Sequence, residues 1–181
     1  MRRRELLLGG LIAPWIGRAD DAGVRPKQVY LIRHGEKTGD KSDIHLNARG
    51  RERAQALVKL FPARFESPEV LFASRRSAHS DREVETLMPL AGALHLRINN
   101  HYADEEYGAL ATDLLKHYAA KTVLVCWHHG NLPPLASALG AQNAPSPWPD
   151  QQFDRLWRIR FPNGVVTMED FPERLLEGDS A

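Results

Sequence analysis

Cysteine is nearly absent from this sequence, which contains a single one, Cys126, among 181 residues. One cysteine cannot form an internal disulfide, and its apolar neighbours predict a small buried hydrophobe rather than a reactive thiol. The sequence also lacks a cysteine cluster and a His-Glu-x-x-His motif, the patterns typical of zinc sites. We therefore expect no metal site and no cofactor.

A strong excess of one charge is also missing. Lys and Arg number 24, Asp and Glu number 23, and the formal net charge is +1. Proteins that bind nucleic acid or an anionic membrane usually carry a broad basic field, so we expect neither partner. An anionic ligand would have to be held by a local cluster of cations.

Long apolar runs are absent too, and the longest is too short to span a bilayer comfortably. This run, residues 6–17, lies between three arginines at positions 2–4 and a stretch of small and polar residues. Such a layout is typical of an export signal, and consecutive arginines are typical of the twin-arginine route. We expect residues 1–22 to direct export to the periplasm or the cell exterior; without a signal the protein would be cytoplasmic. We expect no stable membrane span in the mature chain.

Strand-like and helix-like segments alternate through residues 25–170. The predicted strands are residues 28–32, 69–73, 96–98 and 122–127, and the predicted helices are residues 47–61, 83–94, 104–119 and 132–139. Two more strand-like segments, 155–161 and 165–168, flank a Pro-Asn-Gly turn. This order predicts one three-layer α/β/α sandwich with a mostly parallel central sheet, an antiparallel C-terminal hairpin at its edge, and a polar tail at 171–181.

Two of the predicted strands end in histidine followed by glycine: His34-Gly35 and His129-Gly130. Ligands of such sheets gather at the carboxyl ends of the strands, and glycine allows a sharp turn and a close approach. A neutral imidazole is a good nucleophile for phosphorus, and the forked cation of Arg33 suits phosphate oxygens. A lone histidine at a strand end is more often structural, but the repetition beside an arginine favours a functional site.

Four segments resemble motifs of the histidine phosphatase superfamily, which also contains the phosphoglycerate mutases. They are Leu31-Ile32-Arg33-His34-Gly35-Glu36, Leu46-Asn47-Ala48-Arg49-Gly50 with Arg53-Ala54, the pair Arg82 and Thr86, and His129-Gly130-Asn131. The resemblance extends over residues 29–139, most of the predicted domain, and implies an α/β fold.

The resemblance also implies a role for each matched side chain. His34 would attack phosphorus and carry the phosphoryl group as a phosphohistidine. Arg33, Arg82 and His129 would surround the phosphoryl oxygens, in the place that a metal ion takes in other phosphoryl-transfer enzymes. Gly130 would allow the substrate to come close.

A proton donor for the leaving alcohol is expected near residue 104. Many members of the family have a glutamate four residues before a glycine here, and Asp104 has that spacing from Gly108. Glu105 is the alternative donor and a candidate substrate contact. Acids at this place could equally be stabilising the start of a helix.

Other residues compete for two of these roles. Arg75 and Arg76 could replace Arg82 as the second pocket arginine, but only Arg82 has a threonine, Thr86, four residues later. His128 competes with its neighbour at position 129 on proximity alone; we expect it to point the opposite way and to pack structurally.

The sequence thus predicts a metal-independent phosphatase that hydrolyses a small phosphomonoester through a phosphohistidine on His34. A mutase and a protein-phosphohistidine phosphatase are alternatives within the enzymes. A non-catalytic phosphate-binding module of the same fold is the alternative outside them. The motifs do not specify the substrate.

Overall fold

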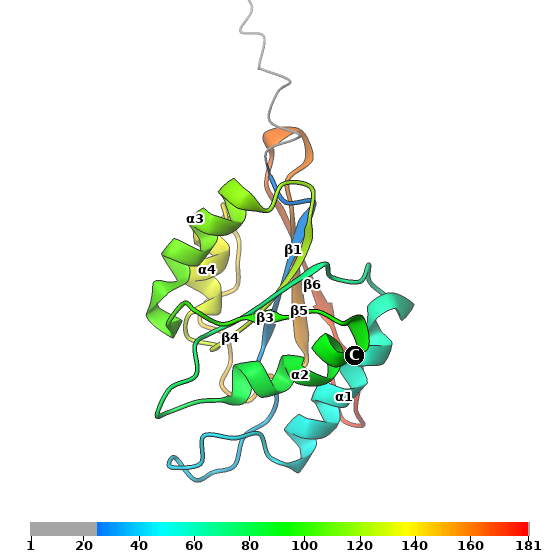
Figure 1. Ribbon diagram of the computed structural model, residues 1–181, viewed down its shortest axis with the longest axis vertical. Coiled ribbons are helices and arrows are strands. Elements are labelled where there is room, and N and C mark those ends of the chain that lie inside the picture. Colours follow the sequence, from blue (N-terminus) through cyan, green and yellow to red (C-terminus); the bar gives the residue numbers. More distant parts are fainter. Residues whose placement is uncertain (1–24, 181) are drawn as a thin grey trace, which may run out of the picture.

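The computed structural model describes residues 25–180, which form a six-stranded sheet with helices on both faces (Figure 1). The expected export signal at residues 1–22 lies outside this range. No helix within residues 25–180 has the length and apolar character needed to cross a membrane.

The sheet has the strand order β3-β2-β4-β1-β5-β6. β3, β2, β4 and β1 run parallel, whereas β5 is antiparallel to β1 and β6 is antiparallel to β5. The strand bounds are β1 Gln28–Arg33, β2 Val70–Ala73, β3 Ile98–Asn99, β4 Thr122–Trp127, β5 Arg155–Arg160 and β6 Thr167–Pro172. The prediction of a parallel sheet with an antiparallel hairpin at one edge is confirmed.

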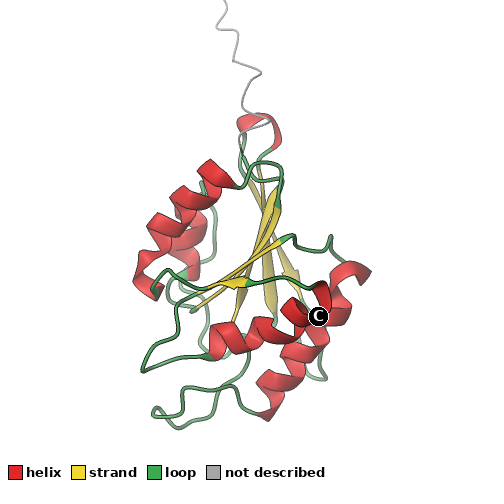
Figure 2. Cartoon of the chain, viewed as in Figure 1, coloured by secondary structure: helices red, strands yellow, loops and turns green. Residues whose placement is uncertain are grey.

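Helices cover the two faces of this sheet in pairs, as Figure 2 shows. The helix bounds are α1 Ala48–Ala63, α2 Arg82–Leu94, α3 Tyr107–His117 and α4 Leu132–Ala138, with short 3-10 turns η2 Asp104–Glu106 and η3 Pro162–Gly164. α1 and α2 pack on the face that includes Tyr30 and Ile32 of β1. α3 and α4 pack on the face that includes Val29 and Leu31. β1 is therefore buried on both sides, which explains why it is apolar without alternation.

Two elements differ most from their predicted bounds. The helix expected to begin at residue 104 starts as the 3-10 turn η2 and becomes α-helical only at Tyr107. β6 begins and ends later than expected, and it reaches Pro172. The following Glu173 is 1% exposed and binds Arg53 of α1, so part of the predicted polar tail packs on the domain.

The carboxyl ends of β1 and β4 lie side by side. Arg33 is in register with Trp127, and the next backbone N–H, that of His34, donates to the carbonyl of Trp127 at 3.3 Å. The residues that follow these two strands therefore meet at one edge of the sheet, as expected for a ligand site in this class of fold.

Candidate active site

His34 follows β1 and its side chain is completely buried. Its Nδ1 lies 2.7 Å from the carbonyl of Gly35, an acceptor, so Nδ1 carries the proton and Nε2 keeps its lone pair. Nε2 has no hydrogen-bond partner among the described residues. Burial, and then the charges of Arg33 and Arg82, hold the pKa of His34 well below its usual range. The ring is therefore neutral at physiological pH, with a free nucleophilic nitrogen.

The turn after His34 is fixed by close contact with the start of α1. A Cβ on Gly35 would lie 2.9 Å from the carbonyl oxygen of Gly50, and a Cβ on Gly50 would lie 2.3 Å from the carbonyl oxygen of Glu36. Both positions therefore require glycine. The N–H of Gly35 also donates to the hydroxyl of Thr86 in α2 at 2.9 Å. These contacts give a physical reason for three of the motifs that the sequence shares with the family.

Arg33 directs its guanidinium into a neighbouring loop. Nη1 donates to the carbonyls of Pro149, Asp150 and Gln152 at 3.3, 2.7 and 3.0 Å. The guanidinium carbon lies 3.8 Å from the centre of the Phe153 ring. Burial lowers the pKa of Arg33 to about 10, so it stays a cation. Arg33 thus fixes the 149–153 loop and places a positive charge beside the nucleophile.

Arg82, the first residue of α2, ties two further loops to the site. Nη1 donates to the carbonyl of Asp43 at 2.7 Å, and Nη2 donates to that of His79 at 3.0 Å. Its charge helps to lower the pKa of His34. Of its rivals, Arg76 forms an ion pair with Asp81 at 2.5 Å. The other rival, at position 75, lines the same cavity as Arg82 but is exposed.

The second histidine beside the nucleophile is His128. Its ring stacks on that of His34 with the centroids 6.1 Å apart and the planes at 28°. His129 instead turns toward Asp150, with Nδ1 3.4 Å from the carboxylate. The expectation that His128 points away is therefore wrong. β4 stays paired through Trp127, so the first residue after it takes the place beside His34.

The protonation of His128 also follows from its contacts. The N–H of Gly130 donates to Nδ1 of His128 at 3.2 Å, which leaves Nε2 as the protonated nitrogen of the neutral ring. Burial, and then the neighbouring His129, lower the pKa of His128 to about 4. His128 is therefore a neutral hydrogen-bond donor at physiological pH. Gly130 acts on the site through this backbone contact.

Asp104 is held at the rim of the site by α4 and β4. Its Oδ2 accepts from Nδ2 of Asn131 at 2.8 Å and lies 3.7 Å from Nδ1 of His128. Its Oδ1 is buried and has no partner among the described residues. Burial raises the pKa of Asp104 to about 6. Glu105 borders the same cavity but is exposed, so the geometry separates the two candidate proton donors.

Arg82, Asp104 and His128 are among the residues that line a cavity of about 410 Å³. Glu83 also lines it, and sequence reasoning missed this residue as a site candidate. Its side chain is 3% exposed and its Oε1 lies 4.0 Å from Nε2 of His34. In the sequence, the one feature that could have indicated a role for Glu83 is its position next to Arg82 at the predicted start of a helix.

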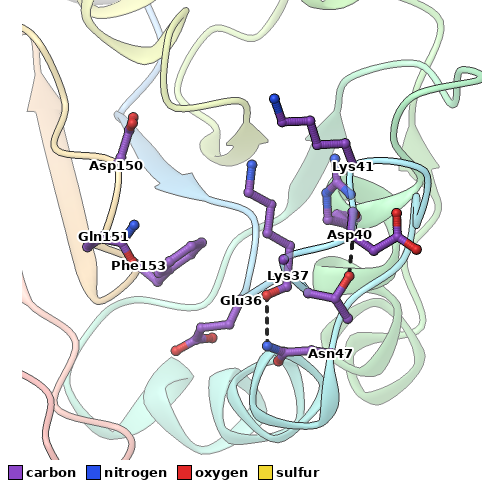
Figure 3. A pocket seen from close by; sticks show the side chains of 11 residues that line it. Glu36, Lys37, Asp40, Lys41, Asn47, Asp150, Gln151 and Phe153 are labelled. Carbon is purple, nitrogen blue, oxygen red and sulfur yellow. Dashed lines mark hydrogen bonds between the residues drawn. The ribbon is translucent and has the colours of Figure 1, made fainter.

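A second, larger cavity of about 630 Å³ opens on the other side of Arg82. Figure 3 shows the side chains of Lys37 and Lys41 extending into this space, across from Asp150 and Phe153. Arg82 lines both cavities. Cations and carboxylates are mixed along this lining, so it does not select one charge by itself.

One group of side chains within residues 25–180 is close enough together to share a metal ion: His45, Asp81 and Glu85. Each already has a partner. Nδ1 of His45 lies 2.5 Å from Glu85, and Asp81 pairs with Arg76. We assign no metal to this group.

Comparison with known proteins shows what part of the chain resembles a known family. The family model described as histidine phosphatase superfamily, branch 1, matches residues 29–110, a range that includes His34, Arg82 and Asp104. No curated protein matches this chain significantly in sequence.

Solved structures of low sequence identity share the fold. The protein histidine phosphatase SixA in complex with tungstate has a TM-score of 0.58 and 18% identity, covering 81% of this chain and 97% of that chain. A SixA protein from Agrobacterium tumefaciens, named as a phosphohistidine phosphatase, has a TM-score of 0.56 and 18% identity, covering 80% and 97%. Phosphoserine phosphatase from Entamoeba histolytica in complex with phosphoserine has a TM-score of 0.53 and 15% identity, covering 82% and 98%. Residues 29–110 thus resemble the histidine phosphatase superfamily in sequence, and residues 25–180 share the fold of these solved structures.

Proposed function

We propose that this protein is a phosphatase that hydrolyses phosphomonoesters through a phosphohistidine on His34. The observation that carries the proposal is the state of this ring: it is buried, neutral and fixed by one hydrogen bond, with an unbonded Nε2 beside the cavity groups. A binding module has no use for a nucleophile prepared in this way, because hydrogen-bond donors alone would hold phosphate.

In the proposed first step, the lone pair of Nε2 of His34 attacks phosphorus in line with the leaving oxygen. The bond from phosphorus to the alcohol oxygen breaks as the bond to nitrogen forms. Arg33 and Arg82 supply positive charge beside the transferring group, and His128 donates a hydrogen bond from Nε2. These fixed charges and donors stabilise the negative charge spread over the phosphoryl oxygens.

Asp104 is the proposed proton donor. With a pKa near 6 it can carry a proton at mildly acidic to neutral pH and give it to the departing alkoxide. The resulting carboxylate then takes a proton from water as that water attacks the phosphohistidine. Phosphate leaves, and both His34 and Asp104 return to their starting states. No metal takes part in the proposed scheme.

The alternative enzymes differ from the proposed one in the donor or the acceptor of the phosphoryl group. A mutase would return it to an organic acceptor, and a protein-phosphohistidine phosphatase would receive it from a histidine. The likeness to the SixA structures, at 18% identity, supports the fold alone and does not favour a phosphohistidine as the donor. The cavities accept a small phosphomonoester, so we retain hydrolysis of such esters as the proposed reaction.

Trapping the covalent intermediate tests this function. The protein would be mixed with a ³²P-labelled aryl phosphate in EDTA and quenched in alkali, in which phosphohistidine survives. We expect label on the wild type and none on His34→Ala, together with a loss of turnover of about a thousand-fold or more. Unchanged turnover by His34→Ala would rule out the nucleophile. Loss of wild-type activity in EDTA would rule out the metal-free scheme.

A further inference from the structure

Glu83 is a buried carboxyl next to the nucleophile that the mechanism above does not use. Its Oε1 lies 4.0 Å from Nε2 of His34, and its Oε2 accepts from the hydroxyl of Ser80 at 2.6 Å. Among residues 25–180, no Lys or Arg forms an ion pair with it. The adjoining Arg82 instead directs its terminal nitrogens to two backbone carbonyls.

Several elements contribute the groups that face Glu83. The titratable groups are His34 after β1, the thiol of Cys126 in β4, His128 after β4 and Asp104 in η2. The charged residues are Asp81 and Arg82 at its own helix start and Arg33 at the end of β1. Burial raises the pKa of Glu83, the hydrogen bonds from Ser80 and from its own backbone N–H and the charge of Arg82 lower it, and Asp81 raises it. The net shift is upward, so Glu83 takes up a proton more readily than an exposed carboxyl does.

The hydrogen bond from Ser80 determines which oxygen carries the proton. The backbone N–H of Arg82 donates to the hydroxyl oxygen of Ser80, and that hydroxyl in turn donates to Oε2 of Glu83. Oε2 thus acts as the carbonyl-like acceptor, and the acidic proton lies on Oε1, the oxygen nearer to His34.

A phosphoryl group in line with Nε2 would bring phosphorus to about 3 Å from that nitrogen. Its equatorial oxygens would then lie within hydrogen-bond range of a group 4.0 Å from the same atom. An ionised carboxylate at this place would repel the phosphoryl dianion, whereas a neutral one would donate to it.

We propose that Glu83 is a phosphoryl-contacting residue whose neutral carboxyl donates a hydrogen bond from Oε1 to an equatorial oxygen. The site then takes up the dianion together with a proton on Glu83. The inference rests on the proposed function, since it assumes that the phosphoryl group sits on His34. It predicts that anion binding weakens as the pH rises and Glu83 ionises.

Sulfate is the best probe, because it stays a dianion across the whole range and needs no turnover. Its dissociation constant would be measured by calorimetry at about pH 5 and about pH 8 for wild type and Glu83→Gln. The glutamine is a matched neutral analogue: its carbonyl can accept from Ser80, and its NH₂ can donate in place of Oε1–H. Glu52→Gln, on the exposed side of α1, is the control.

We expect equal affinities of wild type and Glu83→Gln at the lower pH. At the higher pH, Glu83→Gln should bind sulfate about ten-fold or more tightly than wild type, because it has no proton to take up. Asp104 titrates in both proteins, so its contribution cancels in the ratio. A ratio that does not change with pH, or weaker binding by Glu83→Gln at both pH values, overturns the inference.

A measurement on the wild type covers the case in which Glu83→Gln fails to fold. Sulfate binding at about pH 8 in two buffers of different ionisation enthalpy reports the protons taken up, and we expect net proton uptake on binding. No uptake, or no sulfate binding at all, also overturns the inference. The two experiments separate the two claims. If sulfate binding depends on Glu83 as expected but the labelling experiment gives no phosphohistidine, the proposed function is refuted and the role of Glu83 in binding the anion stands.

Discussion

The charges around His34 serve two purposes at the scale of the single residue. In the empty site, Arg33 and Arg82 help to keep the ring neutral, which preserves the lone pair on Nε2. In the proposed reaction, the same cations would face the negative charge that grows in the transition state. The proposal thus gives one arrangement two roles: it keeps His34 neutral and it stabilises the transferring group.

Asp104 gives a prediction that depends on the leaving group. Asp104→Asn removes the proton donor and should lower kcat for an alkyl phosphate by about a hundred-fold. Turnover of p-nitrophenyl phosphate should fall much less, because nitrophenolate leaves without a proton. Comparing the two substrates by steady-state kinetics checks the role. Glu105→Gln is the matched comparison, and a larger effect there would assign the donor to Glu105.

The pH profile of the wild type follows from the same group. The pKa of Asp104 is raised to about 6, and the donor must be protonated, so kcat/KM for an alkyl phosphate should fall as the pH rises above about 6. In Asp104→Asn the decline should be lost from kcat, whereas kcat/KM should keep the loss of affinity expected as Glu83 ionises.

Single residues also show which parts of the candidate site can be predicted from the sequence and which cannot. Arg33, His34 and Asp104 could be predicted because motif spacing places them after a strand or before a helix. Glu83 could not, since it looks like an ordinary acid in the first turn of a helix. Only the packing of α2 against the end of β1 brings its carboxyl to 4.0 Å from the nucleophile.

At the scale of elements, the length of β4 decides which histidine enters the site. A strand ending one residue later would have reversed the positions of His128 and His129, because neighbouring side chains point in opposite directions. The sequence predicts the bounds of this strand, residues 122–127, as the structure has them. His129 was expected in the site because of the adjoining Gly130 and the family motif, and neither feature specifies which ring faces His34. The parallel sheet with an antiparallel edge was predicted, whereas the order of its strands was not.

The two histidines can be compared directly. His128→Ala removes the donor that stacks on His34 and should lower kcat/KM for p-nitrophenyl phosphate by about a hundred-fold or more. His129→Ala breaks only the contact with Asp150 and should have an effect of about ten-fold or less. Steady-state kinetics of the two variants tests which histidine acts in the site. A larger loss of kcat/KM in His129→Ala than in His128→Ala would assign the role to His129.

The contact between the β1 turn and α1 gives a prediction on stability. Gly50→Ala places a Cβ against the backbone of Glu36 and should lower the free energy of unfolding by about 2 kcal/mol or more. Gly92→Ala in α2 is the control, because an added Cβ there meets nothing within 4 Å. Urea unfolding measures both. Equal stability of the two variants would mean that the turn can move away from the helix.

At the scale of the whole molecule, the segment after β6 ties the end of the chain to the start of the site. Arg53 of α1 is 2% exposed and binds Glu36, Glu173 and Asp179 at 2.7, 3.1 and 2.8 Å. Glu36 lies two residues after His34, so the cluster connects the β1 turn, α1 and the C-terminal segment. The sequence showed only that residues 171–181 are polar, because the partner that draws them in lies more than a hundred positions away.

The ion pairs of Arg53 with these carboxylates should make the free energy of unfolding depend on pH, and Arg53→Ala should change that dependence. Arg53→Ala leaves buried carboxylates unpaired and should cost about 3–5 kcal/mol at neutral pH. Burial raises the pKa of Glu173 to about 8 even with Arg53 present, whereas hydrogen bonds from Arg53 help to lower that of Asp179 to about 2. Without the arginine both values rise, so both groups favour their neutral forms in the folded state.

The sign of the effect follows from these directions. A carboxyl whose pKa is higher in the folded than in the unfolded state loses stability as the pH rises from its ordinary value toward the folded one. Glu173 has its raised pKa in the wild type as well, so its loss of stability between about pH 4 and about pH 8 is common to both proteins and cancels. The difference comes from Asp179: the destabilisation by Arg53→Ala should be smallest at about pH 2 and grow as the pH rises through the ordinary range of a carboxyl. Lys59→Ala, on the exposed side of the same helix, is the control. Urea unfolding across this range measures the trend. A loss that is constant with pH would mean that Arg53 stabilises the protein by packing alone, and that its charge does not hold the C-terminal segment in place.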